Sequence, residues 1–253
     1  MELRVLGCSG GWPGPGEPCS GYLLTAAGRR TWLDAGTGTL PELLRHTELR
    51  ALDAVWITHL HTDHCGDLPA AFHALAYGPP GGGPLPVFGP PGLTGHLLTQ
   101  LDEDPQELHR FLAITELTDN SAHAVGGLRL TAIAVQHGMP AFGLRAEAGG
   151  EVLGYTGDSR SCPAITELAA DADLFLCEAF LSAPTSRPFT SVMTPEDAGR
   201  HAEQGRARRL VLTHLHPGTD PEAARARAAG EYRGPVEVAR PGAVFQTSGG
   251  VRA

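Results

Sequence analysis

Three histidines and one aspartate fall within six consecutive residues of this chain, in the run His59-Leu60-His61-Thr62-Asp63-His64. Imidazole and carboxylate groups are the ligands that Zn²⁺ and similar ions take in proteins. The apolar segment Ala54–Thr58 just before the run indicates a buried strand. Because alternate residues of an extended segment point the same way, His59 and His61 can converge on one ion. Asp63 and His64, where the chain turns toward a helix, can converge on a second.

Further polar residues stand directly after other apolar, strand-like segments. They are His137 after Leu128–Val135, Asp158 after Val152–Thr156, and His214 after Leu210–Thr213. Each residue taken alone would more often be structural or on the surface, but the recurrence of the same pattern favours one shared site. Five histidines and two carboxylates suit two Zn²⁺ ions, although Mn²⁺ or Fe could occupy similar nitrogen and oxygen sites.

The composition excludes several other kinds of site. The net charge of -9 disfavours a nucleic acid as the main partner, because such binding draws on clustered basic residues. All 19 basic residues are arginines, which excludes a lysine Schiff base or lysine general base. The five cysteines lack C-x-x-C spacing, which argues against a disulfide framework and a thiolate zinc site. Without a signal-like or membrane-spanning segment, we expect a soluble, cytoplasmic protein with a small-molecule substrate.

The elements that must position these residues mix strands and helices. Besides the segments named above, strands are expected at Leu3–Leu6, Tyr22–Thr25, Thr31–Asp34 and Leu174–Cys177. Helices are expected at Pro41–His46, Leu68–Ala76, Pro163–Ala170, Pro195–Glu203 and Pro221–Ala229. The Pro- and Gly-rich stretch Gly78–Pro84 is expected to be a surface loop. We therefore expect one α+β domain with layered sheets over residues 1–253; a homodimer is left open.

The ligand pattern resembles that of the metallo-β-lactamase-fold hydrolases, in the branch of ribonuclease Z and small phosphodiesterases. The resemblance extends to the stretches Leu6–Gly11, Leu33–Gly36 and Cys177–Ala179. It implies a four-layer αββα sandwich with the metal site at one edge of the two sheets. It also implies that His59, His61 and His137 hold one zinc, that Asp63, His64 and His214 hold the other, and that Asp158 bridges them.

Two departures from ribonuclease Z concern catalysis and substrate size. The acid matching Glu178 works there beside a histidine, and that histidine corresponds here to Val192, so Glu178 is either catalytic or a structural acid. Ribonuclease Z also commonly inserts a long tRNA-binding arm between the motifs that match His137 and Asp158. These residues lie 21 positions apart here, which leaves no room for the arm and argues against tRNA as a substrate.

Several residues remain candidates for supporting roles. Asp63 could orient the attacking hydroxide while ligating metal, and His216 could donate a proton to a leaving group, with a solvated loop histidine as the alternative. Asp34 and Asp67 could fix imidazole tautomers or serve in capping and turns. Arg160 could meet a substrate phosphate or lie at the surface, Trp12 could border the pocket or anchor its loop, and Cys65 is expected to pack under the helix.

The function expected from these features is a dinuclear zinc hydrolase, acting as a phosphodiesterase on a small or cyclic phosphodiester. Two neighbouring ions can lower the pKa of a shared water and stabilise both oxygens of an in-line displacement. The alternatives are hydrolysis of a thioester, lactone or other ester on the same ions, a non-catalytic metal-dependent binding protein, and oxygen chemistry at iron.

Overall fold

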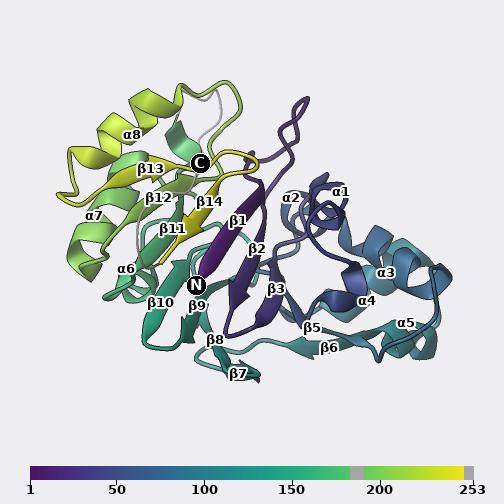
Figure 1. Ribbon diagram of the computed structural model, residues 1–253. Helices are drawn as coiled ribbons and strands as arrows, with labels where there is room; N and C mark the ends of the chain where they lie inside the picture. The colour runs from purple at the N-terminus through teal and green to yellow at the C-terminus, as the bar shows by residue number, and fades with distance from the viewer. Residues whose placement is uncertain (183–190, 248–253) are drawn as a thin grey trace.

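Two mixed seven-stranded sheets form the centre of the computed structural model, which describes residues 1–182 and 191–247 (Figure 1). The first sheet has the order β14 (Val244–Gln246), β1 (Glu2–Gly7), β2 (Gly21–Ala26), β3 (Arg29–Leu33), β4 (Ala54–Trp56), β5 (Leu85–Gly89) and β6 (Leu112–Glu116). The second has the order β13 (Val236–Val238), β12 (Leu210–Thr213), β11 (Leu174–Glu178), β10 (Glu151–Tyr155), β9 (Phe142–Ala148), β8 (Leu128–Ala134) and β7 (Ala122–Val125).

Each sheet joins an antiparallel half to a parallel half. In the first, β14 to β3 pair antiparallel and β3 to β6 pair parallel. In the second, β7 to β10 pair antiparallel and β10 to β13 pair parallel. Parallel strands end at a common edge, so the loops that leave their carboxyl ends lie close together.

The helices cover the outer faces of both sheets (Figure 1). Over the first sheet lie α1 (Thr39–Leu44), η1 (Leu49–Ala51), α2 (Thr62–Cys65), α3 (Leu68–Tyr77), α4 (Leu93–Leu101) and α5 (Pro105–Phe111). Over the second lie α6 (Pro163–Ala169), α7 (Pro195–Gly205) and α8 (Pro221–Ala229), with the short η2 (Phe180–Ser182) after β11.

Alternation along the strands builds three apolar layers. In β12, Val211 faces the central layer between the sheets, whereas Leu210 and Leu212 face the helices. In β3 and β4, Trp56 joins the central layer and Trp32 packs under the helices. This period of two on both faces produces the αββα sandwich expected from the resemblance.

The strands and helices predicted from the sequence are all present, with ends shifted by a few residues. Gly78–Pro84 is a loop between α3 and β5. The helix expected to begin at Pro195 does so, and Thr194 and Asp197 form a reciprocal capping box at the start of α7. The strands β5, β6, β7, β9, β13 and β14 and the helices α2, α4 and α5 were not predicted, as they are short or lack a clear period.

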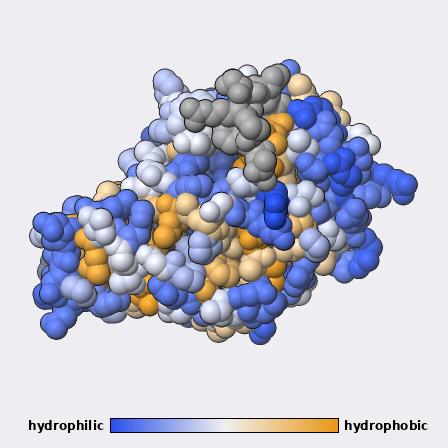
Figure 2. Space-filling view, turned by 180° about the vertical axis from the view of Figure 1, so that it is seen from behind, coloured by the Kyte–Doolittle hydropathy of each residue, from blue (hydrophilic) through white to orange (hydrophobic). Residues whose placement is uncertain are grey.

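The surface seen from behind is mainly hydrophilic, and hydrophilic residues break its apolar area into separate patches (Figure 2). This fits the interior position of the three apolar layers. In the part of the chain that the structure describes, no helix has the length and apolar character to cross a membrane.

Candidate metal centre

Three histidine nitrogens converge at the edge where the two sheets meet. His61 Nδ1 lies 3.1 Å from His59 Nε2 and 3.1 Å from His137 Nε2. His59 follows β4 of the first sheet, and His137 follows β8 of the second. Asp158, after β10, places Oδ2 4.0 Å from His59 Nε2. These four side chains form the first group of potential ligand atoms, all within 4.8 Å of one another.

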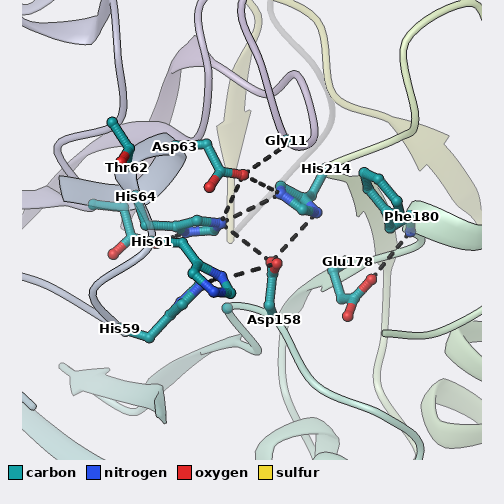
Figure 3. A network of polar contacts seen from close by, with 12 residues as sticks. Gly11, His59, His61, Thr62, Asp63, His64, Asp158, Glu178, Phe180 and His214 are labelled. Atoms are coloured by element: carbon teal, nitrogen blue, oxygen red, sulfur yellow. Dashed lines mark hydrogen bonds and ion pairs between the residues drawn. The ribbon is translucent and has the colours of Figure 1, made fainter. Parts of the chain in front are cut away.

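A second group of four lies beside the first and shares Asp158 with it. His64 Nε2 is 3.3 Å from His214 Nε2, which is 3.0 Å from Asp63 Oδ2. Asp158 Oδ1 is 3.2 Å from His64 Nε2 and 3.3 Å from His214 Nδ1. Figure 3 shows Asp158 between the two groups, with His59 and His61 on one side and His214 on the other. The structure thus brings together all seven side chains predicted as metal ligands.

The donor atoms of this cluster are arranged to bind cations rather than to form hydrogen bonds with one another. One proton on His61 Nδ1 cannot serve two facing nitrogens, whereas ligands 2.0–2.1 Å from a tetrahedral Zn²⁺ lie about 3.3 Å apart. Although Asp158 Oδ1 and His214 Nδ1 lie 3.3 Å apart and are buried, neither makes a hydrogen bond of good geometry to a described residue. Buried polar atoms without partners are rare and costly, and a bound cation would satisfy both. The donor set therefore fits a divalent metal site.

Burial and charge set the protonation of the cluster in a way that suits metal binding. Burial lowers the pKa of His59 and of His61, which keeps their rings neutral. Burial also opposes ionisation of Asp158, but His214 and His64 hold the pKa of its carboxyl well below the usual range. Burial works against a charged His64 as well, yet Asp158 and Asp34 raise its pKa well above the usual value. A cation would compete with that proton for the same anionic surroundings.

Asp34 orients the cluster from beneath, after β3. Its Oδ2 accepts hydrogen bonds from the Tyr155 hydroxyl (2.6 Å) and the Thr58 hydroxyl (2.9 Å) and lies 2.8 Å from His64 Nδ1. Its Oδ1 accepts from the Thr58 amide at 2.8 Å. A carboxylate on Nδ1 leaves Nε2 of His64 free to ligate, which is the usual support for a metal-bound imidazole. Nothing in the sequence singled out Tyr155, because it stands in an ordinary strand pattern.

The backbone around the site is held in special conformations. Asp34 and His214 both have φ of 53°, in the left-handed region that few non-glycine residues adopt. A Cβ on Gly36 would lie 2.1 Å from the carbonyl oxygen of Asp63, so only glycine lets these two segments meet. Such strain is typical of functional sites where the surrounding fold fixes the backbone.

Asp67, the other acid considered as a support for the histidines, makes no hydrogen bond to a cluster ligand among the described residues. Its Oδ2 accepts from the Leu40 amide in the first turn of α1 at 2.7 Å. This is the capping role that the sequence left open for Asp67.

Glu178 is placed among backbone amides. Its Oε1 accepts from the Ser159 amide at 2.9 Å and its Oε2 from the Phe180 amide at 3.0 Å, with a further backbone hydrogen bond from Met193. Figure 3 shows its carboxylate turned toward Phe180 and away from the cluster. Burial and the nearby Asp158 raise the pKa of Glu178 well above its usual value. This geometry fits the structural acid that the loss of histidine at Val192 suggested.

The remaining candidates are His216, Arg160 and Cys65. Nδ1 of His216 is 2.8 Å from the carbonyl oxygen of Pro217, and its ring contacts those of Trp12 and Phe180. Arg160 donates from Nε to Gln136 Oε1 at 2.7 Å, just before His137 in the chain. Cys65 is buried in the apolar layer under α3, as predicted.

Comparison with known proteins agrees with the geometry. The profile of the beta-lactamase superfamily domain matches residues 17–215. The uncharacterized protein ML1173 of Mycobacterium leprae is 35% identical over 97% of this chain and 88% of its own length. The ribonuclease Z of Geobacillus kaustophilus is 28% identical over 88% of this chain and 91% of its own length.

Among solved structures, the metallo-beta-lactamase fold protein YhfI of Bacillus subtilis superposes with a TM-score of 0.85 at 25% identity. The match covers 96% of this chain and 98% of YhfI. With its αββα layers and the histidine and aspartate cluster at their edge, this chain belongs to the beta-lactamase superfamily, as a metal-dependent hydrolase of the metallo-β-lactamase fold.

Proposed function

We propose that this chain is a dinuclear zinc phosphodiesterase that acts on a small or cyclic phosphodiester. The observation that carries the proposal is the position of Asp158. Its two oxygens face two separate groups of donors, with Oδ2 toward His59 and Oδ1 toward His64 and His214. A carboxylate shared in this way suits a pair of neighbouring ions, and His59, His61 and His137 would hold one while Asp63, His64 and His214 hold the other.

The ions, when bound, would activate water and offset the charge that develops on the oxygens of a phosphodiester. The protein's own groups determine the direction of approach. His59, His64, Asp158 and His214 are buried, whereas His61 is exposed and Asp63 and His137 are half-buried. The substrate therefore reaches the cluster from the side of His61, His137 and Asp63.

Asp63 is the carboxylate best placed to accept a hydrogen bond from water on that open side. Its Oδ2 accepts from the Gly11 amide at 2.9 Å and lies 3.0 Å from His214 Nε2. Burial works against the charged form, but His214 and His64 lower the pKa of Asp63 well below the usual range. A charged Asp63 can accept a hydrogen bond from a nucleophilic water and fix its orientation.

The restriction to small substrates rests on the chain between His137 and Asp158. The antiparallel hairpin of β9 and β10 takes up most of those 21 positions, and a tight turn at Gly149–Gly150 joins its strands. No tRNA-binding arm fits there. The net charge of -9 also opposes a polyanion, so we propose a small-molecule substrate.

The test is hydrolysis of bis(p-nitrophenyl) phosphate by protein reconstituted with Zn²⁺, Mn²⁺ or Fe²⁺ and analysed for metal content. We expect turnover with two zinc ions per chain, and its loss in Asp63→Ala. Parallel assays with thioesters, lactones and sulfate esters identify the competing ester hydrolases. Fully metallated protein that cleaves carbonyl esters but no phosphodiester would refute the proposal, as would protein that holds a ligand unchanged.

A further inference from the structure

The loop between β1 and β2 is fixed against the metal centre and carries Trp12 with it. The Gly11 amide donates to Asp63 Oδ2 at 2.9 Å, which ties the loop to one of the cluster carboxylates. Gly10 packs so tightly that a Cβ would lie 2.7 Å from the Phe180 ring and 2.8 Å from the His214 carbonyl oxygen. The Ser9 hydroxyl donates to the Trp12 carbonyl at 2.9 Å. The residue after Gly11 is thus held in place close to the centre.

Four rings continue from the cluster to the surface, and we call them the aromatic wall: His214, Phe180, His216 and Trp12. The centroid of Phe180 lies 5.4 Å from that of His214 and 5.3 Å from that of His216. The ring of Trp12 meets that of His216 at 5.3 Å and 89°. These spacings are those of favourable aromatic pairs, so each ring supports the next.

Trp12, at the outer end of the aromatic wall, is exposed, although proteins ordinarily bury large aromatic side chains. Trp12 is 49% exposed, whereas Trp32 and Trp56 are fully buried. An exposed tryptophan forgoes the free energy of burying a large apolar surface. The loop already fixes the backbone of Trp12, so the protein loses little conformational entropy when a ligand covers the ring.

We propose that Trp12 is a specificity-determining residue that stacks on a planar aromatic group of the substrate, next to the ester bound at the metal centre. The proposal rests on the proposed phosphodiesterase function and specifies its substrate class: a small phosphodiester with an aromatic or heteroaromatic substituent. Rings stack on tryptophan in many protein sites because every flat π-face offers dispersion and quadrupole attraction.

Two phosphate monoesters that differ only in the ring provide the test. Phenyl phosphate and methyl phosphate are titrated as inhibitors of the zinc-loaded enzyme and, separately, as quenchers of its tryptophan emission. Trp12 is the solvent-exposed tryptophan, so quenching by phenyl phosphate reports on it directly. We expect wild type to bind phenyl phosphate about fivefold to tenfold more tightly than methyl phosphate. Trp12→Ala should lose this preference without weaker binding of methyl phosphate, and Trp12→Phe should keep most of it.

Tyr77→Ala is the matched control, since it removes another exposed aromatic side chain, on α3. Its preference should equal that of wild type, and thermal melts should show that all variants are folded. Equal binding of the two esters by wild type, a preference that survives in Trp12→Ala, or no binding of phenyl phosphate would each overturn the inference. A preference that depends on Trp12 in an enzyme inert to phosphodiesters would refute the proposed function and leave the aromatic subsite standing.

Discussion

Replacing Asp34 by asparagine tests whether the buried support beneath the cluster controls metal affinity. Asparagine has nearly the same shape and tolerates the left-handed backbone of Asp34 at φ of 53°, so the change isolates charge and hydrogen bonding. The two carboxylate oxygens accept from the Thr58 amide, the Thr58 hydroxyl and the Tyr155 hydroxyl, and Oδ2 also meets His64 Nδ1. An amide group offers only one acceptor oxygen, so at least one buried donor loses its partner in either orientation.

The size of the effect follows from these contacts. An unsatisfied buried donor costs about 1–3 kcal/mol, which should lower the free energy of unfolding of the metal-free protein by that amount. Loss of the carboxylate behind a ligating histidine typically weakens metal binding about 10- to 100-fold, or about 2 kcal/mol near the middle of that range. In Asp34→Asn we expect the ion that His64 ligates to be bound more weakly than in wild type.

Competition with a chromogenic chelator at fixed pH measures the affinity for added zinc, including that of each ion if the protein binds two, and urea unfolding with chelator present measures the stability of the metal-free protein. Asp67→Asn is the control, because Asp67 lies close to His64 in sequence but its side chain accepts a hydrogen bond from the Leu40 amide instead. That variant should bind zinc as wild type does. If Asp34→Asn kept both affinities within about threefold, or if Asp67→Asn lost as much, the assignment of Asp34 to the His64 ligand would be wrong.

Three further predictions concern the backbone, the buried acid and pH. Gly36→Ala should destabilise the protein by about 3 kcal/mol in urea unfolding, since its Cβ would lie 2.1 Å from a backbone oxygen; Gly28→Ala, whose Cβ meets nothing within 4 Å, should show only the smaller cost of its positive φ. Glu178→Gln should lower stability by about 1–3 kcal/mol but change kcat of folded, metallated enzyme less than threefold; a loss of 100-fold at unchanged melting temperature would make Glu178 catalytic. Burial lowers the pKa of His201 below the ordinary value of about 6.5, so the stability it contributes is present above that pH and is lost as pH falls through and below it. Metal-free wild type should therefore lose more stability between pH 7.5 and pH 5 than His201→Gln, and equal losses in the two proteins would contradict this.

The sequence was a good guide wherever ligands follow strongly apolar strands. His59, Asp158 and His214 stand within three residues of the ends of buried strands, so the periodicity of those strands placed them at a common edge. The supporting groups gave no such signal. Tyr155 sends its hydroxyl to Asp34 from another sheet, and a contact between residues this far apart in the chain depends on how the two sheets pack.

The strands that the sequence did not predict also depend on contacts between segments far apart in the chain. Strand β5 alternates buried and half-buried residues over only five positions, β6 buries only its first residue, and β13 and β14 are three residues long. Segments this short are fixed by their neighbours in the sheet and carry little periodicity of their own. The sequence leaves Trp12 open between a pocket border and a loop anchor, and the packing of its loop against the cluster is what supports the first.

The metal centre draws its donors from both sheets, and this has a consequence for the cohesion of the molecule. His64 follows β4 in the chain and His214 follows β12. The two residues are 150 positions apart in sequence, yet their side chains are in contact. An ion that holds both acts as a removable cross-link around a very large loop, and closing a loop of that size in an unfolded chain costs about 5 kcal/mol of entropy. Loading with metal should therefore make the two sheets open together rather than one at a time. Slow amide exchange in both sheets, lost in parallel on chelation, would be the signature of this coupling.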